Sequence, residues 1–207
     1  MNYLLYPTYF PNIAHFIAMV QSDKFFFEIY DNYQKQTYRN RCTIYSANGR
    51  LDLNIPVRHS QRNRQLTKDI EIANTKDWQS QHFKSLHSAY SRSPFYEFYI
   101  DELEPLFSEP AENLADFNRS SIEKVFSCLQ LPFGYETTNQ FEKHPREYQD
   151  ARGLANARKE IVQDFEPYTQ VFSNANGFIP NLSILDLLFN EGPNAVNYLN
   201  NQRLYLP

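Results

Sequence analysis

Apolar and polar positions in the first thirty residues predict two strands around a helix. Residues 3–6 (YLLY) form a short apolar run that ends at Pro7, and proline cannot donate in a central strand. Over about residues 11–22, apolar side chains recur at helical spacing. These are Ile13, Phe16, Ile17 and Val20. Residues 24–30 (KFFFEIY) are too apolar to face water on both sides, which favours a second buried strand.

A β-hairpin near residues 41–57 is the sharpest local signal. Asn48-Gly49, a pair that tolerates positive φ in a tight turn, lies between the runs CTIY and LDLNIPV. Strict alternation along these runs predicts one inward face and one outward face. The inward positions are Cys42, Ile44, Leu51, Leu53, Ile55 and Val57. If the first arm extends back to residue 38, its opposite face carries Arg39, Arg41, Thr43 and Tyr45.

Helical spacing recurs in the second half of the chain. One helix, capped by Thr75, carries a stripe that consists of Trp78, His82, Leu86 and Tyr90. A second starts at Ser93-Pro94, with an apolar face made of Phe95, Phe98, Tyr99 and Leu103. A third spans about residues 111–130, and a last one runs from near 181–183 to just before Gly192-Pro193.

Three other segments lack helical spacing. Residues 58–68 are polar and basic and indicate a loop or lid, and residues 69–74 favour a short strand. Residues 135–165 are polar and fit no pattern, so we expect a partly mobile insertion. A chain of 207 residues fits a single domain over 1–207. We predict one compact α+β domain with a small mixed or antiparallel sheet, in which several helices pack on the hairpin.

Composition narrows the class of protein. Hydrophobic residues make up 42% and aromatic residues 16% of the chain, which is typical of a globular protein. The net charge of −4 gives no general attraction to nucleic acid or anionic membranes, so neither is an expected partner. Cys42 and Cys128 lie far apart and favour reduced thiols. No run is long enough to span a bilayer, and the first ten residues lack the features of a signal peptide. We expect a cytoplasmic protein.

Generic catalytic motifs do not occur in the sequence. The five glycines show no phosphate-loop spacing, and neither GxSxG nor HExxH is found. His82 and His87 are five residues apart, so on a helix they face different directions and make a poor metal pair. We therefore expect no metal and no cofactor.

The polar stretch NYQKQTYRNRC, residues 32–42, leaves two alternatives open. It is either a solvent-facing strand edge whose charges block edge pairing, or the wall of a ligand site. In the second case Arg39 and Arg41 offer forked donors to a carboxylate or phosphate. Lys35 would be a further cation, and Asn40 an orienting amide. RNA binding is disfavoured by the acidic total and by the lack of an RNA-binding sequence pattern.

The two catalytic candidates, His82 and Asp186, come from other segments. His82 could accept a proton near neutral pH, although a helical histidine is more often simply packed. Asp186 interrupts the apolar run SILDLLF. Because an unpaired buried carboxylate is costly, we expect it to face a cleft or to pair with a cation such as one of the strand arginines. The remaining ligand-binding candidates are Tyr9, Tyr90, Asn181 and Asn190.

An ordered set of local sequences resembles the WbqC-like family. They are YPTYFP, SDKFFFEIYDNYQKQTYRNRCTIYSANGRLDLNIPV, DWQSQHFKSLHSAYSRSPFYEFY and GFIPNLSILDLLFNEGP, which together cover well over half of the chain. The resemblance implies a role in bacterial surface-polysaccharide biosynthesis, notably O-antigen synthesis. Transfer of an amino acid such as glycine to a sugar has been suggested for the family. The family's N-terminal motif has His-Gln before the first proline and Trp after the second, where this chain has Leu5, Tyr6 and Asn12.

Two functions are compatible with these residues. The first is a transferase that attaches an acyl or aminoacyl group to a nucleotide-linked or lipid-linked sugar, with His82 accepting the proton of the attacking group. The second is a non-catalytic carbohydrate or nucleotide-sugar binding protein that scaffolds other enzymes of the pathway, which the missing His-Gln pair favours. The discriminating observation is whether His82 reaches an Arg39/Arg41 pocket in a water-accessible cleft.

Overall fold

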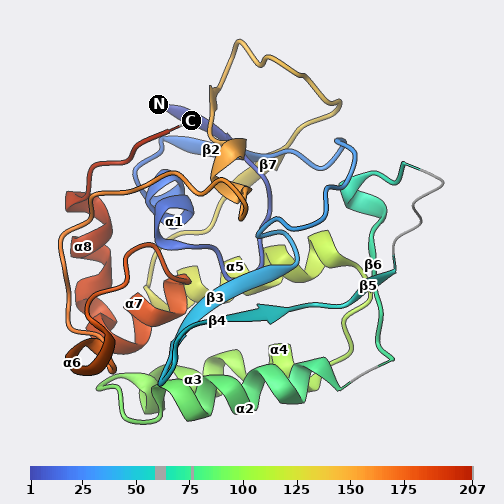
Figure 1. Ribbon diagram of the computed structural model, residues 1–207. Coiled ribbons are helices and arrows are strands. Elements are labelled where there is room, and N and C mark those ends of the chain that lie inside the picture. Colours follow the sequence, from blue (N-terminus) through green and yellow to red (C-terminus); the bar gives the residue numbers. More distant parts are fainter. Residues whose placement is uncertain (59–63, 76, 207) are drawn as a thin grey trace.

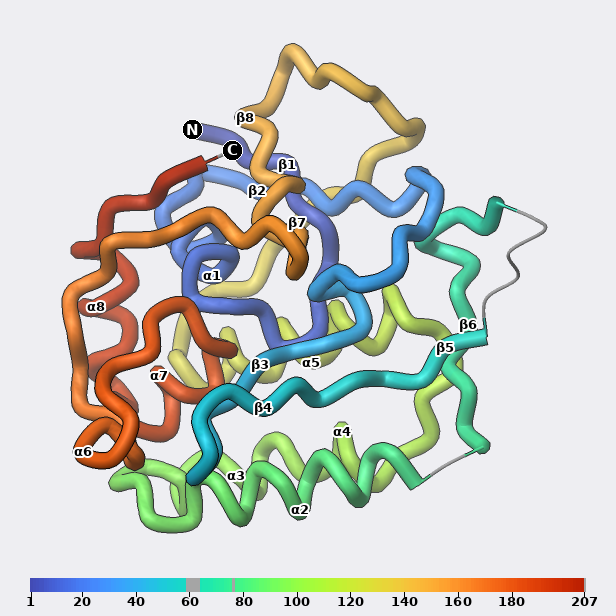
Figure 2. Tube along the Cα trace, viewed as in Figure 1, coloured from blue at the N-terminus to red at the C-terminus, as the bar shows by residue number. Residues whose placement is uncertain are grey.

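The computed structural model describes residues 1–58, 64–75 and 77–206. These residues contain a four-stranded sheet in the order β7-β2-β1-β8, and all its neighbouring strands are parallel. The strands are β1 (Asn2–Leu5), β2 (Lys24–Phe27), β7 (Tyr135–Thr137) and β8 (Gln149–Asp150). In register, Leu4 lies between Phe26 and Asp150. Figure 2 shows the connection between β7 and β8 projecting beyond the rest of the chain.

Helix α1 (Ile13–Val20) connects β1 to β2, as neighbouring parallel strands require a crossover connection. The side chain of Asn12 caps the helix by accepting a hydrogen bond from the backbone N–H of His15 at 2.9 Å. Every residue from 13 to 19 is buried, which agrees with the almost wholly apolar sequence of the helix. It packs against α7 (Ile184–Glu191) and α8 (Ala195–Asn201).

The predicted hairpin consists of β3 (Arg41–Ser46) and β4 (Gly49–Asn54). Gly49 has a φ of 95° at the turn, a conformation that glycine adopts without steric cost. Strand β3 packs against α2 (Trp78–Tyr90) and α7. A second antiparallel pair, β5 (Val57–Arg58) and β6 (Glu71–Ile72), follows the hairpin.

The burial of the hairpin departs from the predicted alternation. Cys42, Ile44 and Leu53 are buried as expected, but Thr43 and Tyr45 are buried too. The reason is that the C-terminal segment covers the second face of β3, where the Tyr45 hydroxyl donates to the backbone carbonyls of residues 172 and 177 at 3.2 and 2.6 Å. Leu51, predicted to face inward, is 37% exposed. The more extensive helix contacts of the hairpin, with α2 and α7, are made by β3.

Helices α3 (Tyr96–Leu103) and α4 (Pro105–Ser108) lie with α2 on one side of the hairpin (Figure 1). Helix α5 (Leu114–Cys128) joins this layer to the parallel sheet through aromatic contacts. The Phe126 ring lies 5.0 Å from Phe16 of α1 and 6.0 Å from Phe25 of β2, whereas Phe117 lies 5.4 Å from Trp78 of α2. The core is therefore continuous across both layers.

The α+β class and the single compact arrangement are confirmed, and the predicted helices overlap α1, α2, α3, α5 and α7. The cap residue of α2 is Asp77 rather than Thr75. Phe98, predicted on the apolar face of α3, is 74% exposed. The helix instead buries the i, i+4, i+7 stripe that consists of Tyr96, Ile100 and Leu103.

Segments without a sequence pattern also have a place in the fold. Residues 135–165 contribute β7, β8 and a 3₁₀ turn (Arg152–Ala155), and α6 (Ser173–Asn176) follows. Of the loop or lid expected over 58–68, residues 59–63 lie outside the described residues. Within the described ranges, no helix combines the length and apolar character needed to cross a membrane.

Candidate functional site

Polar side chains gather where the carboxyl ends of the four parallel strands meet. Tyr6 directly follows β1, Glu28 follows β2 and Thr138 follows β7, whereas Arg152 lies two residues beyond the end of β8. In open sheets with parallel strands, ligands bind in the crevice beyond this edge. The four side chains therefore lie where a ligand site is expected.

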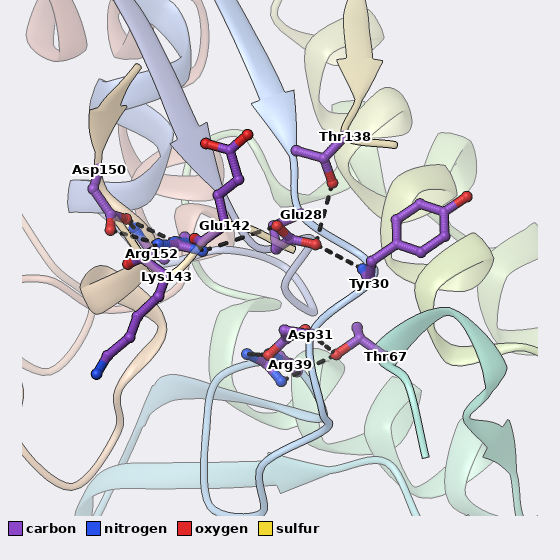
Figure 3. Close-up of polar contacts among 10 residues, drawn as sticks. All are labelled: Glu28, Tyr30, Asp31, Arg39, Thr67, Thr138, Glu142, Lys143, Asp150 and Arg152. Carbon is purple, nitrogen blue, oxygen red and sulfur yellow. Dashed lines mark hydrogen bonds and ion pairs between the residues drawn. The ribbon is translucent and has the colours of Figure 1, made fainter. Parts of the chain in front are cut away.

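Arg39 lies at this edge in a buried cluster with Asp31 and Thr67 (Figure 3). Its Nη2 donates to Asp31 Oδ2 at 2.8 Å and its Nη1 donates to Thr67 Oγ1 at 3.1 Å. The Thr67 hydroxyl in turn donates to Asp31 Oδ1 at 2.6 Å. The guanidinium carbon also lies 3.7 Å from the centre of the Tyr6 ring. Because Arg39 is only 1% exposed and paired with Asp31, its role is first of all structural.

Arg152 forms the second cluster at the edge (Figure 3). Its Nε and Nη2 donate to the two carboxylate oxygens of Asp150 at 2.9 and 2.7 Å. Nη1 and Nη2 also donate to the backbone carbonyls of Glu142 and Lys143, at 2.9 and 3.2 Å. Glu28 Oε2 lies 3.9 Å from Nη1. The hydrogen bonds with Asp150 raise the pKa of Arg152, which therefore stays charged and fastens the β7–β8 connection to the sheet edge.

A cavity of about 660 Å³ opens beside these two clusters, and we name it the basic cavity. It is lined mainly by residues from segments 34–39 and 150–159. Three of its cations, Lys35, Arg158 and Lys159, are exposed and pair with no carboxylate in the described part of the chain. In a protein of net charge −4, this local positive excess attracts anions. The volume is in the range of small-molecule sites.

Backbone contacts hold the two walls of the basic cavity together. Thr37 and Asn156 form an isolated antiparallel bridge between the walls. The Asn156 side-chain oxygen accepts hydrogen bonds from the backbone N–H groups of Arg158 and Lys159 at 3.0 and 3.1 Å. These contacts fix the turn that carries two of the cations, and they place it opposite Lys35.

Of the predicted ligand-binding cations, the structure brings Lys35 and Arg39 together in the basic cavity but not Arg41. Arg41 pairs with Asp52 at 3.4 Å and lines a separate cavity of about 330 Å³. The first arm of the hairpin does not extend back to residue 38, because β3 begins at Arg41, so the condition for a shared strand face is not met.

His82 and Tyr9 lie in aromatic packing away from the basic cavity. The His82 Nδ1 lies 3.0 Å from the Tyr9 hydroxyl, and its ring centre lies 5.2 Å from that of Trp78. His82 is only 5% exposed. Burial lowers its pKa to about 4, although a backbone hydrogen bond at Asn54 opposes the shift. Because His82 does not line the basic cavity, the geometry does not favour it as the base of a transferase.

Asp186 is fully buried and forms hydrogen bonds with neutral donors instead of the expected cation. Its carboxylate accepts hydrogen bonds from the hydroxyls of Tyr90 and Tyr168 at 2.9 and 2.5 Å and from Gln170 Nε2 at 2.8 Å. No arginine pairs with it among the residues described. Asn190 Nδ2 donates to the backbone carbonyl of Asp186 at 2.8 Å. Two phenols and an amide thus satisfy the carboxylate, and the cluster anchors the C-terminal segment.

We expect Asp186 to stabilise the protein more at pH 4.5 than at pH 7. Burial raises its pKa to about 6, above the value of about 3.9 in an unfolded chain, so the folded state binds the proton more tightly. This stabilisation is present at low pH and is lost as the pH rises toward 6. The difference in free energy of unfolding between the parent and Asp186→Asn should be about 2 kcal/mol larger at pH 4.5 than at pH 7. Urea unfolding measures it, and an equal difference at both pH values would contradict the raised pKa.

The last two ligand-binding candidates, Asn40 and Asn181, form contacts within the fold. Asn40 Nδ2 donates to the carbonyl of Ile55 at 2.9 Å and holds the two arms of the hairpin together. Asn181 accepts a hydrogen bond from the backbone N–H of Ala14 at 2.8 Å and donates to Glu160 at 2.7 Å. Neither amide lines the basic cavity.

The donor groups at the site suit an anionic ligand better than a metal ion. Among the described residues, no group of three or more His, Cys, Asp or Glu side chains is arranged to hold a metal. Cys42 and Cys128 are free thiols, and burial raises the pKa of both. The basic cavity instead presents ammonium and guanidinium groups, which bind carboxylates and phosphates.

Several residues of the site were not identified from the sequence. They are Tyr6, Glu28, Asp31, Thr67, Asp150, Arg152, Arg158 and Lys159. Glu28 and Asp31 follow the apolar strand at 24–27, and this is a usable signal, because polar residues directly after a buried strand can mark the edge of the sheet where a ligand binds. Asp150, Arg152, Arg158 and Lys159 lie in or after β8, a strand of two residues that local sequence does not predict.

Comparisons with known proteins agree with these local similarities. A model of the WbqC-like protein family matches residues 6–160 and 142–198. The chain is 29% identical to the uncharacterized protein Rv1507c of Mycobacterium tuberculosis, in an alignment that covers 92% of this chain and 94% of that protein. No solved structure matches the chain. Because the family model covers most of its length, the chain belongs to the WbqC-like protein family.

Proposed function

We propose that the protein binds an anionic, sugar-linked small molecule in the basic cavity and acts in bacterial surface-polysaccharide biosynthesis. The observation that carries this proposal is the set of three cations beyond the carboxyl edge of the parallel sheet, which pair with no carboxylate among the described residues. Membership of the WbqC-like family supports the pathway, since the resemblance implies that biology. The proposal places the protein in the cytoplasm beside other enzymes of the pathway, with no nucleic-acid partner.

As an enzyme, the protein would transfer an acyl or aminoacyl group to a nucleotide-linked or lipid-linked sugar. Lys35, Arg158 and Lys159 would hold the phosphate or carboxylate of the activated donor. The same cations would stabilise the negative charge that develops on the leaving group. Arg39 and Arg152 would contribute fixed positive charge to the same cavity, because Asp31 and Asp150 already hold their guanidinium groups.

A non-catalytic role is the second candidate, and the position of His82 favours it. That residue is buried among aromatic rings and does not line the basic cavity. In this case the protein would bind a nucleotide sugar or a carbohydrate and present it to other enzymes. Both candidates require the same anion site, so a binding experiment tests the feature that they share.

Replacing the three unpaired cations should weaken binding of a nucleoside diphosphate by about 10- to 100-fold. Each exposed charge contact contributes about 0.5–1 kcal/mol, and every 1.4 kcal/mol is a factor of ten in affinity. The variant is Lys35→Gln/Arg158→Gln/Lys159→Gln, and calorimetric titration with uridine diphosphate measures the change. A matched control removes three exposed cations elsewhere, as Lys84→Gln/Arg92→Gln/Arg203→Gln. Equal affinity for the two triple variants would contradict the proposed site.

A further inference from the structure

A second, smaller cavity of about 150 Å³ lies at the same edge of the sheet, and we name it the Glu28 cavity. It lies between the ends of the strands and residues 138–148, which connect β7 to β8. Figure 3 shows Glu28 between Thr138 and Arg152. A cavity of this volume can hold one six-membered ring, since an engineered cavity of about 150 Å³ binds benzene.

One carboxylate oxygen of Glu28 accepts no hydrogen bond from the residues that the structure describes. Its Oε1 accepts hydrogen bonds from the backbone N–H of Tyr30 at 2.7 Å and from the Thr138 hydroxyl at 3.1 Å. Its Oε2 is buried and has no hydrogen-bond partner among the described residues. Arg152 Nη1, at 3.9 Å, lies too far away to donate. A buried carboxylate oxygen that lacks a donor is costly, and a donor that a ligand brings to this oxygen would reduce that cost.

The other side chains at the Glu28 cavity suit a polyhydroxylated ring. Asn139 and Gln140 are exposed amides that can both donate and accept hydrogen bonds. Tyr148 provides an aromatic ring, whose centre lies 4.5 Å from that of Phe26. Sugar hydroxyls donate to carboxylates and exchange hydrogen bonds with amides, and the C–H face of a sugar packs on an aromatic ring. The carboxylates here make the cavity unsuitable for a second anion.

Arg152 of the basic cavity is the cation next to Glu28. It lines the basic cavity and lies within 3.9 Å of Glu28 Oε2. We propose that the Glu28 cavity is the sugar subsite of the ligand, in which Glu28 Oε2 accepts a hydrogen bond from a sugar hydroxyl. The anionic part of the same molecule lies in the basic cavity, so this inference rests on the proposed function. Burial also raises the pKa of Glu28, in keeping with an oxygen that lacks a donor in the free protein.

Matched pairs of nucleotides and nucleotide sugars test the subsite. Calorimetric titration compares uridine diphosphate with UDP-glucose and UDP-N-acetylglucosamine, and guanosine diphosphate with GDP-mannose. In the parent protein, at least one sugar should increase the affinity five-fold or more over its nucleotide. Glu28→Gln should reduce this gain to less than two-fold and leave the affinity for the nucleotide within two-fold. Glu123→Gln, an exposed change on α5, is the control and should keep the gain.

The outcomes separate the subsite from the anion site. If the nucleotides bind but the attached sugar adds no affinity, the subsite is overturned and the proposed function stands. No binding of any probe overturns both. An equal loss of nucleotide and nucleotide-sugar affinity in Glu28→Gln overturns the subsite, because Glu28 then acts through Arg152. If Glu28→Gln does not fold, the exposed change Asn139→Ala is measured in its place. The subsite is overturned if the sugar increases the affinity of Asn139→Ala as much as it increases that of the parent protein.

Discussion

Arg39→Met should lower the free energy of unfolding by about 3–5 kcal/mol, as expected when one member of a buried ion pair is removed. Arg39 and Asp31 are 1% and 3% exposed, so the substitution leaves a carboxylate buried without its cation. Asp31 would lose the guanidinium donor at 2.8 Å and would keep the Thr67 hydroxyl, which donates to its other carboxylate oxygen. Urea unfolding followed by circular dichroism measures the loss.

A nearby exposed cation provides the control for Arg39. Lys35→Met removes a positive charge from the same basic cavity, but its side chain is exposed, so stability should change by no more than about 0.5 kcal/mol. The double variant Arg39→Met/Asp31→Leu should recover part of the loss, because it no longer buries an unpaired charge. A loss below about 1 kcal/mol in Arg39→Met would instead mean that the cluster contributes little to folding.

Arg152→Met should cost about 3 kcal/mol or more and should loosen the β7–β8 connection. The substitution removes the paired bonds to Asp150 and the donors to the carbonyls of Glu142 and Lys143. It also removes the cation nearest to Glu28, which is fully buried. Breaking a partly buried charge network of this kind typically costs several kcal/mol.

Limited trypsin digestion reports on the connection itself. Cleavage after Lys143 and Arg146 should become faster in Arg152→Met, since the segment is no longer fastened to the sheet edge. Lys24→Met is the control: it also removes a cation that pairs with a carboxylate, but its pair with Glu136 is exposed, whereas Arg152 is buried. Unchanged stability together with unchanged cleavage in Arg152→Met would show that the guanidinium does not hold this segment.

Much of the fold could be predicted because its signals are local. The turn at Asn48-Gly49, the apolar run of α1 and the helical stripe of α2 each depend on residues within one element. Burial across the hairpin could not be predicted in the same way. The C-terminal segment covers the outer face of β3, so Tyr45 is buried where alternation predicts exposure. Leu51 shows the opposite error, because it is 37% exposed where alternation predicts burial.

The candidate site was predictable only in part, because long-range pairing assembles it. Lys35 and Arg39 were identified from a polar stretch, and both line the basic cavity. Arg158 and Lys159 come from a segment without periodicity, which pairing between β8 and β1 brings to the sheet edge. His82 has a residue type that suits catalysis, but helix packing places it among aromatic rings. Residue type alone does not indicate which side chains converge on one cavity.

The direct test of the basic cavity is a titration of ¹⁵N-labelled protein with uridine diphosphate, followed by amide chemical shifts. The largest changes should fall on residues 34–37 and 153–159, with smaller ones at Tyr6 and Arg39. Changes that cluster instead along α4 and α5, or on the cavity that Arg41 lines, would contradict the assignment of the anion site. So would the absence of any change at millimolar ligand.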